Sequence, residues 1–311
     1  MADPITTLDR FQGSLIGLAV GDAVGTTVEF QPRGSFPLVT DMVGGGPFRL
    51  QPGQWTDDTS MALCLATSLL ECGGFDPVDQ MQRYCRWAEE GYLSSTGHCF
   101  DIGNTVSRAL RQFRQTGEPF SGPTHPQSAG NGCLMRLAPV PMFYFPDVAQ
   151  MVGFSGESAR TTHGAQECVE ASRLFGAMVG RALAGASRAA ILSGYDDLNL
   201  ATDTLQSIAA GHYQTLERDQ IRGSGYVVES LAAALWCFWT THTYADAILA
   251  ATNLGDDADT TAAICGQLAG AHYGLSGIPQ PWRERLTDYD TILALATRLH
   301  QAQPQAQSAL E

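Results

Sequence analysis

The strongest indication of the fold lies in residues 227–239, which read VVESLAAALWCFW. The large apolar side chains of this stretch do not keep to one helical face; they are Val227, Val228, Leu231, Leu235, Phe238 and Trp239. A helix that is apolar on several faces is expected to be covered on several sides by other elements. The stretch therefore predicts a helix at the centre of the protein.

Helical spacing recurs outside this stretch. Val106, Leu110 and Phe113 are separated by four and three residues, which places them on one helical face. Asp76 followed by Pro77 marks a helix start, because the carboxylate can accept free amide hydrogens and proline is tolerated in the first turn. Sustained alternation of apolar and polar residues, which would indicate a sheet, does not occur. We predict an all-α protein.

The chain is long enough to bury a sizeable core, with 311 residues of which 44% are hydrophobic. No linker rich in proline, serine or glycine divides it into halves. We predict one compact multi-helix domain over residues 11–300, with an N-terminal extension over 1–10. The low-complexity residues 301–311 are predicted to form a flexible tail.

The charge balance excludes some partners. A net charge of −14, from 32 acidic and 18 basic residues, opposes binding to nucleic acid or to an anionic membrane. The longest strongly apolar run, Leu231 to Trp239, is too short to span a bilayer, and the N-terminus lacks the pattern of a signal peptide. Eight scattered cysteines without a CxxC pair favour reduced thiols. We expect a cytoplasmic protein without a nucleic-acid partner or an integral membrane segment.

Two short acidic clusters precede apolar helical stretches. Residues 55–60 read WTDDTS, and residues 255–261 read GDDADTT. Carboxylate and hydroxyl oxygens are the ligands that hard divalent cations prefer, so two such helix starts facing each other would hold two ions. Aspartate and threonine are also good helix caps, and composition alone leaves both interpretations open.

Three stretches rich in glycine and polar residues are predicted to be loops that line a cleft. They are residues 43–54, 117–132 and 153–164. Functional groups often lie on such loops, because a rigid scaffold can present them to a ligand.

Seven motifs, in order over residues 11–282, resemble the ADP-ribosylglycohydrolase family, and its dinitrogenase-reductase-activating members most closely. The motifs are GSLIGLAVGDAVGTTVEF, WTDDTSMAL, GHCFDIGNT, GNGCLMRLAPV, TTHGAQECVEASRLF, GSGYVVESLAAALWCF and NLGDDADTTAAICGQLAGAHYG. This resemblance implies an all-α fold with a metal cleft formed by loops and helix N-termini.

The resemblance also implies two divalent cations, Mg²⁺ or Mn²⁺, as cofactors. Its metal ligands match Thr56, Asp57 and Asp58 in the first cluster and Asp257, Asp259 and Thr260 in the second. Asp259 would lie between the ions. Asp256 has no ligand role in the family pattern and is interpreted as an exposed or capping neighbour.

Glu29, Asp58 and Asp101 are the catalytic residues that the resemblance implies. Glu29 follows the segment 21–25, which resembles a family loop whose glycines let the backbone approach the ligand. Asp101 lies in GHCFDIGNT, where arginine-type members carry an acid near the scissile bond. On spacing alone Glu29 is an ordinary surface glutamate and Asp101 a helix cap. Asp22 is interpreted as structural.

Four further residues are implied to contact the substrate. Asn131 and Gly132 would bind pyrophosphate or ribose, and His163 matches a histidine of the family's ligand side. Tyr226 would lie against the sugar or the adenine. Taken without the resemblance, Asn131 and Gly132 form a plain turn signal, His163 is as readily a loop histidine, and Tyr226 is a packing aromatic.

The implied reaction is hydrolysis of the N-glycosidic bond between ADP-ribose and an arginine side chain of a modified protein. ADP-ribose is then the product, dinitrogenase reductase is one implied target, and nitrogen-signalling proteins are implied regulatory partners. Three alternatives stay open: hydrolysis of serine-linked or other O-linked ADP-ribose, two-metal phosphohydrolysis, and non-catalytic binding of ADP-ribose.

Overall fold

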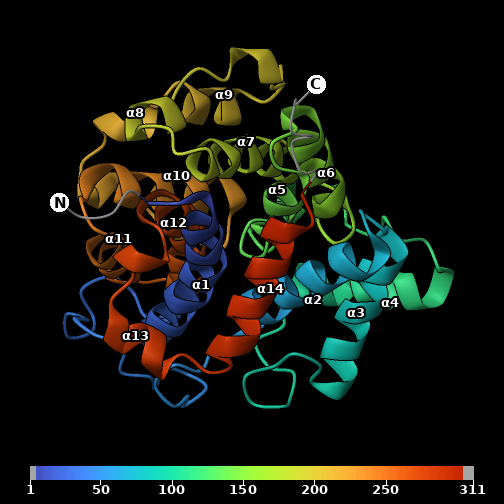
Figure 1. Ribbon diagram of the computed structural model, residues 1–311, viewed down its shortest axis with the longest axis horizontal. Helices are drawn as coiled ribbons and strands as arrows, with labels where there is room; N and C mark the ends of the chain where they lie inside the picture. Colours follow the sequence, from blue (N-terminus) through green and yellow to red (C-terminus); the bar gives the residue numbers. More distant parts are fainter. Residues whose placement is uncertain (1–4, 304–311) are drawn as a thin grey trace, which may run out of the picture.

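The computed structural model describes residues 5–303, and over this range the chain is helical, without a β-strand (Figure 1). The α-helices are α1 (Thr7–Gly25), α2 (Asp57–Cys72), α3 (Pro77–Glu90), α4 (Asn104–Thr116), α5 (Pro139–Tyr144), α6 (Val148–Arg160), α7 (Gln166–Leu183), α8 (Arg188–Ile191), α9 (Asp203–Ala209), α10 (Val227–Thr240), α11 (Tyr244–Thr252), α12 (Ala258–Tyr273), α13 (Gln280–Arg285) and α14 (Tyr289–Gln301). Short 3₁₀ helices lie between them: η1 (Thr26–Val28), η2 (Pro126–Ser128), η3 (Asp196–Leu198), η4 (His212–Thr215), η5 (Arg218–Gln220) and η6 (Leu275–Gly277). The all-α prediction is confirmed.

The centre of the fold is the antiparallel pair of α1 and α12, which make the most extensive helix contact of the described chain (Figure 1). Every fourth residue of α1 on this side is a glycine, namely Gly13, Gly17, Gly21 and Gly25. A Cβ atom on Gly17 would lie 2.4 Å from the carbonyl oxygen of Gly266, so only glycine fits there. A Cβ atom on Gly25 would lie 2.5 Å from the carbonyl oxygen of Ala258. We call this backbone contact the glycine stripe.

The glycine stripe corrects one expectation about residues 21–25. They form the last turn of α1 and pack against α12, whereas the resemblance implied a loop that approaches the ligand. Their effect on the site is indirect, because α1 ends at Gly25 and η1 then leads the chain directly to Glu29. Close packing of α1 on α12 thereby brings Glu29 next to the start of α12.

Helix α10 packs beside this pair, on α12 and α7, and the predicted central position is wrong. Its inner side chains, including Leu231 and Leu235, are buried, but Trp239 is 37% exposed and Val228 is only half-buried. Helices α1 and α12 are buried along almost their whole length. The apolar pattern of the sequence did not single out α1 and α12, because their many glycines and alanines contribute little to a hydrophobic stripe.

Some domain and loop boundaries in the structure differ from the predicted ones. Helix α1 begins at Thr7, inside the expected extension, and α14 continues to Gln301. The remainder of the predicted tail, residues 304–311, lies outside the described residues. Residues 153–160, expected to be a loop, belong to α6, whereas 43–54 and 117–132 contain no α-helix.

A second, smaller apolar core lies between α2, α3 and α4. It is formed by Met61, Cys64, Met81, Tyr84, Cys85, Trp87, Val106, Ala109, Leu110, Phe113 and Met135. This core fixes α2 and α4, whose first turns carry or follow predicted site residues. Burial of its apolar surface therefore also holds the site in shape.

The cysteines and the hydropathy of the helices complete the description of the fold. All eight cysteines are free thiols, and six of them are buried. Within residues 5–303, no helix combines the length and the apolar character that crossing a membrane requires.

Candidate active site

A pocket of about 450 Å³ opens where the first turns of α2, α4 and α12 meet several loops. The predicted site residues that line it are Glu29, Asp57, Asp101, Asn131, Gly132, His163, Asp257, Asp259 and Thr260. Thr56 and Asp58 are buried directly behind this lining. Tyr226 lies outside it, in a neighbouring hollow that shares Thr105, Gly130 and Gly225 with the pocket.

The two acidic clusters face each other across the starts of α2 and α12. The Thr56 hydroxyl lies 3.4 Å from a carboxylate oxygen of Asp259, and the Thr260 hydroxyl lies 3.4 Å from one of Asp58. These residues are about two hundred positions apart in the chain. The juxtaposition that the resemblance implied is therefore present in the fold.

Helix capping accounts for only part of these acids. Asp259 accepts the Thr260 amide in the first turn of α12 at 2.7 Å. The start of α2 is capped by Asp22 of α1, whose carboxylate accepts the amides of Thr56 (2.9 Å) and Thr59 (3.0 Å) and both hydroxyls. Asp257 holds the N-cap position of α12, but its side chain accepts no capping hydrogen bond. Asp22 is thus structural, as expected, and it leaves the carboxylates of the first cluster free for another purpose.

We call the carboxylates on this side the acidic wall: Glu29, Asp57, Asp58, Asp101, Asp257 and Asp259. Burial, together with repulsion among neighbouring carboxylates, raises the pKa values of Asp57, Asp58 and Asp259 well above the ordinary range. The buried oxygens Glu29 Oε2 and Asp58 Oδ2 have no hydrogen-bond partner within residues 5–303. Buried anionic oxygens without donors are costly, and a bound cation would satisfy them.

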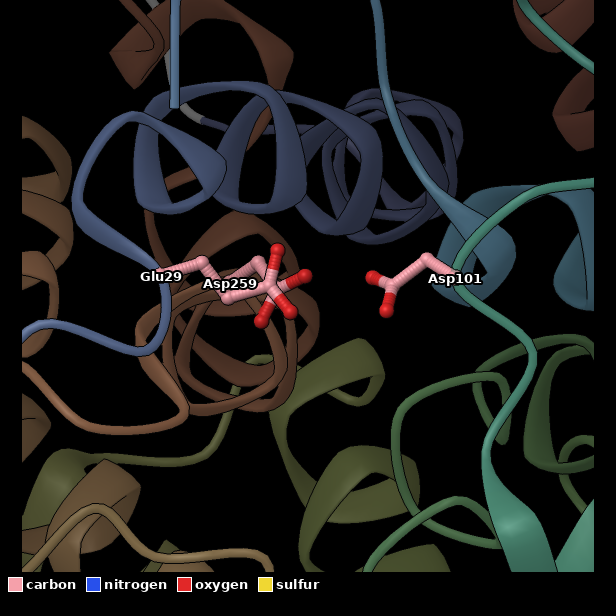
Figure 2. A group of neighbouring side chains, drawn as sticks. All are labelled: Glu29, Asp101 and Asp259. Carbon is pink, nitrogen blue, oxygen red and sulfur yellow. The ribbon is translucent and has the colours of Figure 1, made fainter. Parts of the chain in front are cut away.

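Three carboxylates of the acidic wall converge most closely. Each of Glu29, Asp101 and Asp259 offers an oxygen, and the three oxygens lie within 4.8 Å of one another. Figure 2 shows Glu29 and Asp259 together, with Asp101 pointing at them from the opposite side. Burial and the charges of neighbouring carboxylates raise the pKa of Glu29 to about 9, and burial raises that of Asp101 to about 7. A donor set made only of oxygens fits a hard divalent cation.

The backbone around this group is in the left-handed region at three non-glycine residues. Phe30 has φ 62°, Asp101 has φ 56° and Asp256 has φ 57°. The Phe30 amide donates to the Asp256 carbonyl at 2.7 Å, which fixes the chain next to Glu29. The Asp256 side chain itself is exposed, as expected for a neighbour of the ligands. Strained backbone of this kind persists where the surrounding structure enforces it, often at functional sites.

A second part of the pocket lining, which we call the glycine wall, consists of residues 130–132 and His163. Asn131 connects the two walls, because its side-chain amide donates to Asp257 at 2.8 Å and lies 3.3 Å from the Ser230 hydroxyl. Gly132 is required, since a Cβ atom there would lie 2.9 Å from the His163 ring. Tyr226 is farther out, and its phenol donates to Glu167 at 2.7 Å.

Sequence reasoning missed several residues that position the site. Buried Ser230 supports Asn131, and buried Thr162 contacts His163 at 2.8 Å. Thr162 stands directly before His163 in the TTHG motif, which was the only available signal for it. Ser230 lies in α10, whose mainly apolar sequence gave no sign that the Ser230 hydroxyl supports the site.

Comparison with known proteins identifies the family of this chain. Residues 3–309 match the ADP-ribosylglycohydrolase family. The chain is 45% identical to the ADP-ribosylarginine hydrolase Tri1 of Serratia proteamaculans (strain 568), covering 96% of this chain and 81% of that protein. It is 32% identical to the ADP-ribosyl-[dinitrogen reductase] glycohydrolase of Rhodospirillum rubrum, covering 93% and 97%. A solved structure described as an ADP-ribosylglycohydrolase-related protein complex is 43% identical, with a TM-score of 0.84 and coverage of 95% and 98%.

These identities correct the expected placement next to the dinitrogenase-reductase-activating members. The Pseudomonas putida (strain GB-1) ADP-ribosylarginine hydrolase Tri1 is also 45% identical, over 97% of this chain and 81% of that protein. Both arginine hydrolases are thus more similar to this chain than the dinitrogen reductase enzyme is. The family match, which covers nearly the whole chain, establishes that this protein belongs to the ADP-ribosylglycohydrolase family.

Proposed function

We propose that this protein is a divalent-cation-dependent hydrolase that releases ADP-ribose from arginine side chains of modified proteins. The observation that carries the proposal is the convergence of Glu29, Asp101 and Asp259 beside two facing acidic helix starts. The 45% identity to proteins named ADP-ribosylarginine hydrolases supports the arginine linkage.

The proposed cofactors are two Mg²⁺ or Mn²⁺ ions. Their ligands would be Thr56, Asp57, Asp58, Asp257, Asp259 and Thr260. Bound there, divalent cations supply Lewis-acid stabilisation and orient substrate hydroxyls and water. Asp58 is buried behind the pocket lining, which favours a ligand role over direct contact with substrate.

The protein's own groups account for proton movement and binding. Asp101 faces the pocket, where its carboxyl group would exchange a proton with the leaving nitrogen. Glu29 lies on the other side of the same group and would hold the water. Asn131, Gly132 and His163 line the wall on which the pyrophosphate and ribose would bind. Tyr226 would contact only a part of the substrate that extends into the neighbouring hollow.

The test uses a matched pair of variants from the two acidic clusters. Asp57→Asn should abolish release of ADP-ribose from an arginine-modified protein, while Asp256→Asn, in the exposed neighbour, should leave it within about twofold. Asparagine tolerates the left-handed backbone at 256, so this control is not expected to disturb the fold. Circular dichroism should show unchanged helix content in both. Full activity of Asp57→Asn would overturn the proposal.

The same assay separates the alternatives by substrate and product. Faster turnover of a serine-linked peptide would replace the arginine assignment, and release of phosphate would indicate a phosphohydrolase. Binding of ADP-ribose without turnover at any cation concentration would indicate a non-catalytic binder. Dinitrogenase reductase is a further proposal, supported by the 32% identity to the Rhodospirillum rubrum enzyme, and the modified form of that protein serves as a second substrate.

A further inference from the structure

A chain of three buried residues runs from the protein core to the glycine wall. Arg136 and Thr162 are completely buried, and His163 is 1% exposed. The Arg136 guanidinium donates to the Thr162 hydroxyl at 2.6 Å, and this hydroxyl lies 2.8 Å from His163 Nδ1. The histidine lines the pocket, so the chain connects the core directly to the ligand side.

Arg136 is unusual because its charge is buried among neutral groups. Its guanidinium donates to the carbonyl of Gly132 at 2.9 Å and lies over the Tyr84 ring at 4.8 Å. Within residues 5–303 it has no carboxylate partner. Its other contacts are with the Ser158 carbonyl and Met61 Sδ. Buried charges are normally paired, so a guanidinium whose shortest hydrogen bonds go to Thr162 and to Gly132 of the glycine wall points to a role in shaping that wall.

The donors and acceptors determine the proton position on His163. Arginine can only donate, so the Thr162 oxygen is an acceptor in that contact. The Thr162 hydroxyl hydrogen then has one remaining acceptor within the described residues, His163 Nδ1. If Nδ1 carried the proton instead, the completely buried hydroxyl would lose its acceptor, an arrangement that folded proteins avoid. The satisfied arrangement has Nδ1 as acceptor and the proton on Nε2.

The Nε2 edge of His163 faces Gly130 and Gly132, and Nε2 has no hydrogen-bond partner within residues 5–303. Cβ atoms added to Gly130 and Gly132 would lie 3.3 Å and 3.2 Å from Nε2, so these glycines leave room for that edge. Burial, with a smaller contribution from the Arg136 charge, lowers the pKa of His163 to about 3, and the ring is neutral at physiological pH. A neutral ring protonated on Nε2 is a directed donor.

We propose that Arg136 and Thr162 are positioning residues that hold His163 as a neutral Nε2–H donor to an anionic oxygen of the bound ligand. Because the proposed function supplies that ligand, the recipient is a pyrophosphate oxygen of ADP-ribose. The role of Arg136 and Thr162 is to fix which ring nitrogen carries the proton.

The direct test is the ¹⁵N NMR spectrum of histidine-labelled protein, with His163 assigned by loss of its signals in His163→Gln. At pH 7 the wild-type protein should show a protonated Nε2 and an unprotonated Nδ1. A protonated Nδ1 in the wild-type protein would overturn the proposal. This measurement needs neither a cation nor turnover, so its result is independent of whether the protein hydrolyses ADP-ribosyl-arginine.

The mutational test uses neighbouring buried threonines. Thr162→Val should produce a mixture of the two tautomers and weaken ADP-ribose binding about tenfold, with a larger effect on KM than on kcat. Thr162→Ser, which keeps the hydroxyl group, should restore both the single tautomer and the affinity for ADP-ribose. The control is Thr161→Val, since Thr161 is equally buried but donates to the Ser158 carbonyl and does not contact His163. Equal loss of binding in both valine variants, or failure of Thr162→Ser to restore the tautomer, would contradict the proposal.

Discussion

The two walls of the pocket satisfy their polar groups in opposite ways. The acidic wall crowds six carboxylates together and leaves Glu29 Oε2 and Asp58 Oδ2 without hydrogen-bond partners in the described chain. The glycine wall is held by hydrogen bonds within the protein, from the buried Arg136 guanidinium to the Gly132 carbonyl and the Thr162 hydroxyl, and from Asn131 to Ser230. The acidic wall is therefore an arrangement that could bind a cation, whereas the glycine wall makes its hydrogen bonds within the described chain.

The largest expected effect follows from changing the acidic wall at its centre. Asp259→Asn should lower ADP-ribose release by about 10³-fold, because it removes the carboxylate that would lie between the two proposed ions. In the presence of chelator the same change should raise Tm by about 2–4 °C, because it relieves repulsion among buried carboxylates. Activity assays and thermal unfolding check both outcomes. A lower Tm in chelator would contradict the account of the acidic wall as an uncompensated cluster.

Removing divalent cations should have the next largest effect. Treatment with chelator should lower activity by about 10²-fold, and Mn²⁺ or Mg²⁺ should restore it. Cation at about one hundred times its Kd should also stabilise the folded protein by about 2.7 kcal/mol, seen as a rise in Tm. His163→Gln, on the glycine wall, should retain this rise, and Asp259→Asn should lose most of it. An equal loss in both variants would remove the distinction between the walls.

A smaller effect is expected at Asn131, the residue that joins the walls. Asn131→Ala should lower kcat/KM about tenfold, because it removes the donor to Asp257 and leaves that carboxylate less well placed. Steady-state kinetics over a range of Mn²⁺ concentrations checks this. Asn131→Asp should be worse than alanine, since it adds a further negative charge to the acidic wall. A milder effect of aspartate would show that charge does not dominate at this position.

The smallest effect is expected outside both walls. Tyr226→Phe should change kcat/KM by no more than about twofold, because the Tyr226 hydroxyl is already used by Glu167 and does not face the pocket. Steady-state kinetics with the arginine-modified protein measures this. A tenfold loss would place the substrate in the neighbouring hollow and extend the site beyond the two walls.

Local sequence signals predicted the helices and the acidic clusters well. The paired carboxylates of WTDDTS and GDDADTT stand at helix starts, and the ordered motifs implied that these starts face each other, as the structure shows. Glu29 and Asp101 were predicted from the resemblance, because their spacing alone favoured a surface glutamate and a helix cap. Whether they act as proposed stays a prediction.

Features that depend on contacts between distant segments could not be predicted. Asp22 caps α2 from another helix, and nothing in its own surroundings in the sequence shows that partner. The apolar pattern predicted a central position for α10 and none for α1. The reason is that the large apolar residues of α10 outweigh the glycines of α1 in any measure of hydrophobic periodicity. Residues 153–160 were mistaken for a loop because two glycines hid a helical stretch.

The glycine stripe limits how the pocket can change. Along the glycine stripe, helices α1 and α12 touch through their backbones, and a side chain on these glycines would not fit. Glu29 follows the end of α1 and Asp259 lies in the first turn of α12, so the close contact of the two helices also brings these two carboxylates near each other. We therefore expect substitutions that alter substrate range in this scaffold to lie in pocket-lining residues 101–106, a loop that leads into the first turn of α4, because this segment can change without parting the two helices.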